Sequence, residues 1–367
     1  MKKLIAFMLI VFIFFCSSFS WIQKPSIPIA SCSIFSDTLL YPDESHFRNI
    51  QQLTTGGTNA EAYFSYDGKW LIFQRSNPEE GIPCDQIFIG KIPALPGEKF
   101  TYKMISSGKG RTTCGFFTRD GKHIVYASTH LAGDGCPPVP DKKKRYIWPV
   151  YEGYDIFMAD LTGKIVKQLT NSPGYDAEAT LSPNGDRMIF TSVRDGDLDL
   201  YVMDMRTFKV KRITHELGYD GGAWFSPDGK KIIWRASRPK TPEEIEDYKN
   251  LLNQGLVAPT QMEVWIANSD GTDARQITHY GKANWAPNFI PGSPKIIFCS
   301  NHEYERGFPF NMYTVNTDGS ELEKISHNKG FDAFPMFSPD GKKIVFCSNR
   351  NSPDGKEINV FIADWKQ

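Results

Sequence analysis

The feature that most constrains the fold is a short segment that occurs six times along the chain. The stretch FSPDGKK at residues 225–231 returns unchanged at residues 337–343, and aligning the chain on itself reveals further, less similar copies. Each copy has a short apolar stretch, a turn that is Asp-Gly or Asn-Gly in five of them, and an alternating apolar stretch; the copies cover residues 62–76, 115–129, 179–193, 223–237, 287–301 and 335–349. Because Asp-Gly and Asn-Gly tolerate the positive φ of a tight turn, each copy predicts a β-hairpin.

A second pair of predicted strands follows most copies, as in residues 197–214, 263–278 and 311–326. Four strands in about 40 residues is typical of a propeller blade. The last unit ends after its third strand at residues 359–365, while residues 47–54 predict a lone strand ahead of the first unit. Pairing these two segments would complete one blade and leave no open sheet edge. The predicted fold class is therefore all-β: a single six-bladed β-propeller of four-stranded blades over residues 47–367, closed by the N-terminal strand.

The composition agrees with this fold and argues against nucleic acids as partners. Aromatic residues make up 13% of the 367 residues, and there are 30 Gly and 24 Pro, which favours many short strands joined by tight turns. The 42 basic residues are balanced by 42 acidic ones, so the formal net charge is zero. Because nucleic-acid binding needs a basic face, we expect no nucleic acid among the partners.

The N-terminus predicts export. Lys2 and Lys3 precede an apolar run at residues 4–15, which is too short to span a bilayer comfortably. Ser18-Phe19-Ser20 then offers small residues at a cleavage site. We therefore predict a signal peptide at residues 1–20, no transmembrane segment after cleavage, and an N-terminal extension at residues 21–46 of a periplasmic or secreted protein. Lipidation at Cys16 or Cys32 is the alternative.

The repeats resemble a known family. The FSPDGKKI turns, the SxR or SN that ends the second strand, and the LYxMD and RQIT strands are similar to the repeats of TolB-like six-bladed propellers, which also resemble the propeller of prolyl oligopeptidases. The resemblance covers residues 47–365 and implies a periplasmic or secreted propeller that binds other proteins. TolB carries an additional α/β domain before its propeller, and here residues 21–46 stand in that place.

One face of the predicted ring is the richer in functional side chains. The Asp-Gly turns lie together on one face, and the loops that lead into the first strand and out of the second strand gather on the other. The candidate binding residues in those loops are Glu61, Arg75, Arg111, His130, Asp176, Glu178, Arg194, Asp220, Arg235, Asn284, Asn301, Asp332 and Arg350. They form either a charged funnel for a ligand or a set of ion pairs between neighbouring blades.

Two large insertions, residues 130–152 and 239–262, fall on the same face. The second predicts a helix, because Thr241 can cap it, Pro242 suits its first turn and Glu244 completes a capping box. The insertions therefore favour a funnel that is partly covered.

The leading functional interpretation is a non-catalytic binding module of the cell envelope. We expect it to be a monomer and to bind an envelope protein, a peptide or a glycan. The alternative is an enzyme, a lyase or hydrolase acting on a glycan or peptide, with His130 or Glu178 as its base. The chain has no HExxH and no GxSxG motif, and the acidic run at residues 195–199 lacks the Glu of a calcium loop and is better explained as a turn. We therefore predict no catalytic residue, metal site or cofactor.

Export also bears on the cysteines, because disulfides form outside the cytoplasm. Cys84 and Cys114 lie in adjacent predicted loops, and we expect a disulfide between them, with Cys136 as the alternative partner. Cys299 and Cys347 occupy the same strand position in adjacent units, which predicts two buried free thiols.

Overall fold

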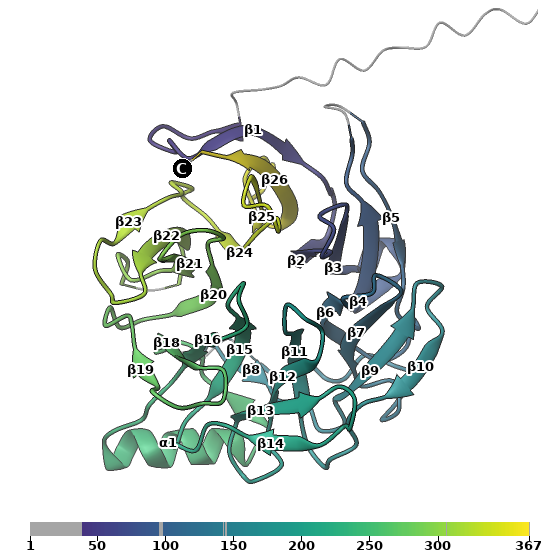
Figure 1. Cartoon of the computed structure of the whole chain (residues 1–367), viewed down its shortest axis with the longest axis vertical. Helices are drawn as coiled ribbons and strands as arrows, with labels where there is room; N and C mark the ends of the chain where they lie inside the picture. The colour runs from purple at the N-terminus through teal and green to yellow at the C-terminus, as the bar shows by residue number, and fades with distance from the viewer. Residues whose placement is uncertain (1–38, 95–97, 142, 144, 306, 367) are drawn as a thin grey trace, which may run out of the picture. The chain divides into compact units, whose positions relative to one another are not determined.

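The described residues of the computed structural model are 39–94, 98–141, 143, 145–305 and 307–366. Their strands form six four-stranded antiparallel sheets that stand around a common axis as the blades of a propeller (Figure 1). The predicted fold class is confirmed. The predicted signal peptide lies outside the described residues, as does most of the N-terminal extension, so both stay predictions.

The first three blades follow the chain order. Blade one consists of β2 (Thr58–Phe64), β3 (Trp70–Asn77), β4 (Ile82–Lys91) and β5 (Thr101–Met104), with a short 3-10 helix at Pro78–Glu80. Blade two consists of β6 (Thr112–Phe117), β7 (His123–Ser128), β9 (Asp155–Asp160) and β10 (Ile165–Gln168). Blade three consists of β11 (Asp176–Leu181), β12 (Arg187–Ser192), β13 (Asp199–Asp204) and β14 (Val210–Arg212).

The last three blades complete the ring. Blade four consists of β15 (Asp220–Phe225), β16 (Lys231–Ala236), β18 (Glu263–Asn268) and β19 (Arg275–Gln276). Blade five consists of β20 (Asn284–Phe289), β21 (Lys295–Ser300), β22 (Asn311–Asn316) and β23 (Glu323–Lys324). Blade six consists of β24 (Asp332–Phe337), β25 (Lys343–Ser348), β26 (Asn359–Trp365) and, from the other end of the chain, β1 (Phe47–Gln52). The predicted closure is confirmed, because β1 pairs antiparallel with β26.

The blades are held together by apolar side chains that project from both faces of each sheet. The middle strands are almost fully buried, as in the KIIFCS sequence of β21, where Ile296, Ile297 and Phe298 have no exposed surface. Between blades four and five, for example, Ile233 and Val264 pack against Ile296 and Phe298. Burial of such side chains contributes about 1.5–3 kcal/mol each, so the inter-blade cores supply most of the stability of the ring.

A hydroxyl group fixes the end of the fourth strand in every blade. The sequence pairs Leu-Thr, Ile-Thr and Ile-Ser place the hydroxyls of Thr54, Ser106, Thr170, Thr214, Thr278 and Ser326 at this position. Each hydroxyl accepts a hydrogen bond of 2.8–2.9 Å from a third-strand backbone N–H. Each also donates to a side chain of the third strand, as Thr214 does to Asp199 at 3.1 Å. The RQIT pattern of the sequence therefore encodes the contact that joins the outer strand to its blade.

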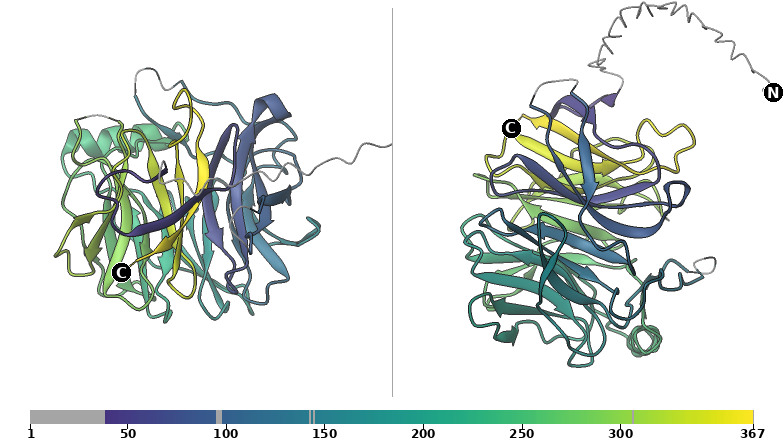
Figure 2. Two further views of the ribbon diagram at one scale, coloured as in Figure 1. Left: turned by 90° about the horizontal axis from the view of Figure 1, so that it is seen from above. Right: turned by 90° about the vertical axis from the view of Figure 1, so that its right-hand side faces the viewer.

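The helix α1 (Pro242–Leu252) confirms the prediction for the second insertion. Thr241 accepts from the backbone N–H of Glu244, whose side chain accepts from the backbone of Thr241, so the capping box is complete. Both insertions lie on the same face of the ring (Figure 2). They meet in a two-stranded sheet of β8 (Trp148–Pro149) and β17 (Leu256–Val257).

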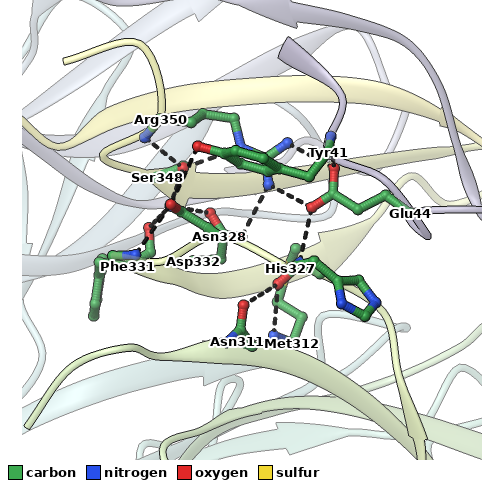
Figure 3. Close-up of polar contacts among 12 residues, drawn as sticks. Tyr41, Glu44, Asn311, Met312, His327, Asn328, Phe331, Asp332, Ser348 and Arg350 are labelled. Atoms are coloured by element: carbon green, nitrogen blue, oxygen red, sulfur yellow. Dashed lines mark hydrogen bonds and ion pairs between the residues drawn. The ribbon is translucent and has the colours of Figure 1, made fainter. Parts of the chain in front are cut away.

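A buried ion-pair triad fastens residues 39–46 to blade six (Figure 3). Arg350 donates to Glu44 Oε1 at 3.0 Å and to Asp332 Oδ2 at 2.9 Å, and none of the three side chains is more than 1% exposed. Tyr41 adds a hydrogen bond of 3.3 Å to Asn328. Because two carboxylates share one guanidinium in a place that water does not reach, each charge depends on the others.

Replacing the guanidinium should therefore destabilise the closed ring. We expect Arg350→Met to lower the free energy of unfolding by about 3–5 kcal/mol, because it leaves two buried carboxylates without a cation. Urea denaturation measures the change, with Lys342→Met on the opposite face as the control. Adding Glu44→Gln and Asp332→Asn to Arg350→Met should recover part of the loss. A loss below about 1 kcal/mol would show that the triad does not hold the ring.

Candidate functional site

The innermost strand of every blade carries a bulge at one equivalent residue. The pairing with the second strand shifts register there, as between Ala177 and Thr180 in blade three. The bulged residues have a positive φ of 49–61°, and we call them the bulge ring: Glu61, Cys114, Glu178, Gly222, Ala286 and Phe334. All six line one central cavity. The shared backbone conformation therefore sets a ring of side chains around the axis of the propeller.

The bulge ring divides the cavity into two unlike halves. Blades one to three contribute Glu61, Cys114 and Glu178, whereas blades four to six contribute Gly222, Ala286 and Phe334. The cavity has a volume of about 390 Å³, which lies within the range of small-molecule sites. The bulge residues of one half thus offer hydrogen-bonding and ionisable groups, and those of the other half offer apolar surface or bare backbone.

Aromatic side chains two residues beyond the bulge ring close the cavity towards the Asp-Gly turns. Trp224 of blade four reaches across the axis to Tyr63 and Phe116, with ring centroids 4.8 and 5.2 Å apart. Tyr66 crosses from blade one to donate to the backbone oxygen of Ser182 at 2.8 Å. We call Tyr63, Phe116 and Trp224 the aromatic floor. The floor therefore separates the cavity from the face that carries the Asp-Gly turns.

The two-stranded sheet β8–β17 covers the cavity on that face, and we call it the roof. Its Trp148 lies between Arg235 of blade four, 5.3 Å from the indole ring, and Trp285 of blade five, whose ring centroid is 4.9 Å away. Trp285 in turn donates through Nε1 to the backbone oxygen of Pro259 at 2.9 Å. The insertions are also joined by Arg145, which donates to both oxygens of Asp247 at 2.7 and 2.6 Å. The predicted partly covered funnel therefore has a defined roof.

A disulfide ties the first insertion to blade one, and it corrects the pairing expected from the sequence. Cys84 bonds to Cys136 with a Cα separation of 5.9 Å, while Cys114 is a free thiol. The predicted Cys84–Cys114 bond is wrong because Cys114 occupies the bulge, which points its side chain into the cavity. The first insertion instead returns to blade one, where the backbone of Asp134 accepts from the N–H of Gly110. The predicted buried thiols of Cys299 and Cys347 are confirmed.

In the polar half, Glu178 is fully satisfied by its neighbours. Its Oε1 accepts from Tyr219 at 2.6 Å and from Arg235, and its Oε2 accepts from Thr191 at 2.9 Å and from the N–H of Gly222 at 2.8 Å. A Cβ on Gly222 would overlap Nη1 of Arg235, so a residue without a side chain is needed for the guanidinium to cross from blade four to blade three. Glu178 and Arg235 therefore form a closed inter-blade ion pair.

Glu61 occupies the same position in blade one but lacks such a partner. Its Oε2 accepts from the thiol of Cys114 at 3.0 Å and, at 3.4 Å, from the hydroxyl of Tyr63. No ion pair of Glu61 occurs within the described part of the chain. Burial raises the pKa of Glu61, and the nearby Glu178 carboxylate adds to this against the opposing Cys114 hydrogen bond. Burial likewise raises the pKa of the Cys114 thiol, which is therefore held protonated.

Other charged residues form pairs within their own blades, and we call Arg194, Arg238 and Arg350 with their carboxylate partners the rim. Arg194 donates to Asp176 at 2.9 Å, Arg238 to Asp220 at 2.7 Å and Arg350 to Asp332 at 2.9 Å. The sequence predicted ion pairs between neighbouring blades. In these three pairs, however, the carboxylate at the start of the first strand and the arginine in the loop after the second strand belong to the same blade. Arg75 similarly donates to Asn59 at 2.7 Å within blade one and pairs with Glu80.

The remaining predicted residues lie away from the bulge ring or at its margin. Asn284 donates to the backbone oxygens of Met262 and Gly281, and Asn301 accepts from the N–H of Ala283. His130 contacts Ser128 at 3.0 Å and lies against Phe157. Arg111 lines the cavity and pairs with Asp85 at 3.4 Å. Of the thirteen predicted residues, the cavity thus brings together Glu61, Arg111, Glu178 and Arg235.

Comparison with known proteins agrees with this architecture. The family described as the TolB beta propeller domain matches residues 140–247. A putative TolB from Agrobacterium tumefaciens aligns with a TM-score of 0.56 at 18% identity, covering 87% of this chain and 97% of that one. The chain is therefore a six-bladed β-propeller whose fold is similar to that of TolB. TolB from Acinetobacter baumannii gives a TM-score of 0.55 at 20% identity over 75% of this chain and 56% of its own length. No curated protein matches the sequence.

The TolB-like repeat contains a signal that sequence reasoning missed. The residue immediately before each of the six aligned copies is the bulge residue, so the ring Glu61, Cys114, Glu178, Gly222, Ala286 and Phe334 stands in one column just outside the alignment. Two of its members were predicted as isolated loop residues. The aromatic floor could also have been found from the column two residues later, where Tyr63, Phe116 and Trp224 stand.

Two searches of the described residues bear on chemistry and location. No group of three or more His, Cys, Asp or Glu side chains there could hold a metal ion. No helix in the same residues has the length and hydropathy to cross a membrane. Residues 193–198 form the connection between β12 and β13, so Asp195 and Asp197 lie in a turn as expected, whereas Asp199 is the first residue of β13. The Cys84–Cys136 disulfide is typical of a protein outside the cytoplasm.

The disulfide should restrain the first insertion, which carries β8 of the roof. We expect Cys84→Ser to lower the free energy of unfolding by about 2–4 kcal/mol, because the bond closes a long loop, and to speed tryptic cleavage after Lys143 or Arg145. Timed proteolysis followed by mass spectrometry measures the rate. Cys114→Ser leaves the disulfide intact and is the matched control. Equal cleavage rates in the two variants would mean that the disulfide does not restrain the first insertion.

The raised pKa of Glu61 predicts a particular dependence of stability on pH. A carboxyl whose pKa is higher in the folded protein loses stabilisation as pH rises from its ordinary pKa through the raised one. Glu61→Gln removes this loss, so it should raise the melting temperature at neutral pH and have little effect below the ordinary carboxyl pKa. Thermal denaturation across pH tests this, with Glu243→Gln on the exposed side of α1 as the control. A difference that is constant across pH would contradict the burial of Glu61 as a lone carboxyl.

Proposed function

We propose that this TolB-like propeller is an exported, non-catalytic binding module that takes a small ligand, or the end of a partner's peptide or glycan, into its central cavity. The observation that carries the proposal is the cavity itself, which has a floor, a roof and two chemically unlike walls. A pocket of about 390 Å³ in which polar groups stand among aromatic side chains suits recognition of a small group. An extracytoplasmic site of action accords with the disulfide and with the predicted signal peptide.

The chemistry of the cavity favours binding over catalysis. Both oxygens of Glu178 already accept hydrogen bonds and Arg235 neutralises its charge, so it is poorly suited to act as a base. The Cys114 thiol is held protonated, which disfavours it as a nucleophile. His130 lies in the loop after β7 and does not line the cavity.

One observation favours an enzyme as the second candidate. Glu61 and Glu178 are carboxyl groups in unlike surroundings, one with a raised pKa and one paired with Arg235. Such a difference is what an acid and a base acting together require. An enzyme would convert its glycan or peptide ligand, whereas a binding module would return it unchanged.

Filling the cavity should abolish binding without disturbing the fold. Phe334 shows that a phenylalanine fits the bulge conformation, so Ala286→Phe places a second ring at the equivalent residue of the neighbouring blade. The exported protein is incubated with an envelope extract, and released compounds are identified by mass spectrometry. We expect at least about tenfold less compound with Ala286→Phe and a smaller loss with Ala286→Leu.

Lys230→Glu, in an Asp-Gly turn on the opposite face, provides the control. A compound recovered unchanged from the wild type supports a binding module, and a converted one supports the enzyme. Capture that is lost with Lys230→Glu and kept with Ala286→Phe would place the working surface on the turn face.

A further inference from the structure

The charged groups of the cavity are not balanced. Its lining contains the carboxyl groups of Glu61, Asp85 and Glu178 and the guanidinium groups of Arg111 and Arg235. Arg235 pairs with Glu178, and Arg111 pairs with Asp85 at 3.4 Å. With three carboxyl groups and two guanidinium groups, one carboxyl group has no cationic partner, and the contacts identify it as that of Glu61. The cavity therefore carries one negative charge that its own side chains do not compensate when Glu61 is ionised.

Three other arginines of this protein that pair with buried carboxylates also lie on aromatic rings. Arg235, the partner of Glu178, lies over Trp148 and Tyr219. The same pattern holds for Arg194, which pairs with Asp176 and lies over Phe190 and Tyr201, with the guanidinium 5.2 and 4.9 Å from the ring centroids. Arg350 repeats it over Tyr41 and Phe346. A buried cation is thus stabilised here by a carboxylate on one side and by π-faces on the other.

Glu61 has the carboxylate and the rings of this arrangement but no guanidinium. Its neighbour in the bulge ring is Phe334 of blade six, which lines the same cavity together with Phe331 and Trp285. Tyr63 and Trp224 lie below it in the aromatic floor. The hydrogen bonds that Glu61 accepts come from a thiol and from a distant phenol, and both are weak donors compared with a cation.

We propose that the cavity binds a small organic ammonium ion, with its positive charge against Glu61 and its alkyl groups against the aromatic wall of Phe334, Phe331 and Trp285. The inference rests on the proposed function, since it names the chemistry of the ligand for the same site. The volume of about 390 Å³ limits the ligand to a small molecule or to the end of a larger one. A neutral sugar would leave the charge of Glu61 uncompensated.

Binding of a cation should depend on pH in a defined direction. The charged and titratable groups around Glu61 are Cys114, Tyr63, Glu178, Arg235 and Asp85. Glu178 and Asp85 are ion-paired, and burial holds both Cys114 and Tyr63 in their neutral forms. Glu61 is therefore the group that must lose a proton for the ligand to bind, and affinity should rise with pH until Glu61 is ionised.

Calorimetric titration of the full exported protein with choline tests the proposal, with 3,3-dimethylbutan-1-ol as a neutral probe of the same shape. We expect choline to bind on the order of tenfold more tightly than the alcohol, because only choline carries the charge. Glu61→Gln should weaken choline binding by about tenfold or more and remove its pH dependence, while Glu61→Asp should retain part of it. Glu243→Gln, an identical change on exposed α1, should bind like the wild type.

Two results would overturn the inference: equal affinity for choline and the alcohol, or unchanged choline binding by Glu61→Gln with its fold verified by circular dichroism. If either occurs while capture from the extract remains sensitive to Ala286→Phe, the cavity still binds a ligand, but that ligand is not an ammonium ion. If Ala286→Phe also captures normally, the proposed function fails together with the inference.

Discussion

The bulge in the innermost strand of each blade is the constraint on which the rest of the structure depends. A residue with positive φ at one equivalent position of each blade turns five side chains and one glycine towards the axis, from Glu61 in blade one to Phe334 in blade six. The strand then resumes its alternation, which sends Tyr63, Phe116 and Trp224 inward one step lower. The same β-bulge, present in all six blades, therefore forms both the wall and the floor of the cavity. The residue type at each bulge decides the chemistry of that wall.

The charged residues that stabilise the fold differ from the one that we expect to contact a ligand. The rim arginines are bound to carboxylates of their own blades, and the triad of Arg350, Glu44 and Asp332 ties the start of the described chain to the last blade. Such pairs are costly to break and leave little charge for a ligand. Glu61 is the exception, because the thiol of Cys114 stands where another blade would supply a cation. The carboxyl group of Glu61, which has the weakest hydrogen-bond partners of the cavity's carboxyls, thus lines the cavity where a ligand can contact it.

The sequence predicted the features that local rules determine. The Asp-Gly turns and the capping box of Thr241 and Glu244 follow from residues close together in the chain, and the closing strand at residues 47–52 follows from the fourth strand that the last repeat lacks; all three are present. The disulfide was mispredicted because its partner depends on the path of a long insertion back to blade one. The imbalance at Glu61 was also hidden, since it depends on which blade contributes an arginine and on a glycine at position 222 that lets Arg235 reach Glu178. Long-range paths and pairings of this kind are not encoded in a repeat.

The central claim is that ligands bind in the cavity beneath the roof and not on the rim. A crystal structure of the protein grown with choline tests it most directly. The account predicts ligand density inside the cavity, with the ammonium group beside Glu61 and against Phe334, below Trp148 of the roof. Density confined to the rim, beside Arg194 or Arg238, with the cavity holding only water, would contradict it.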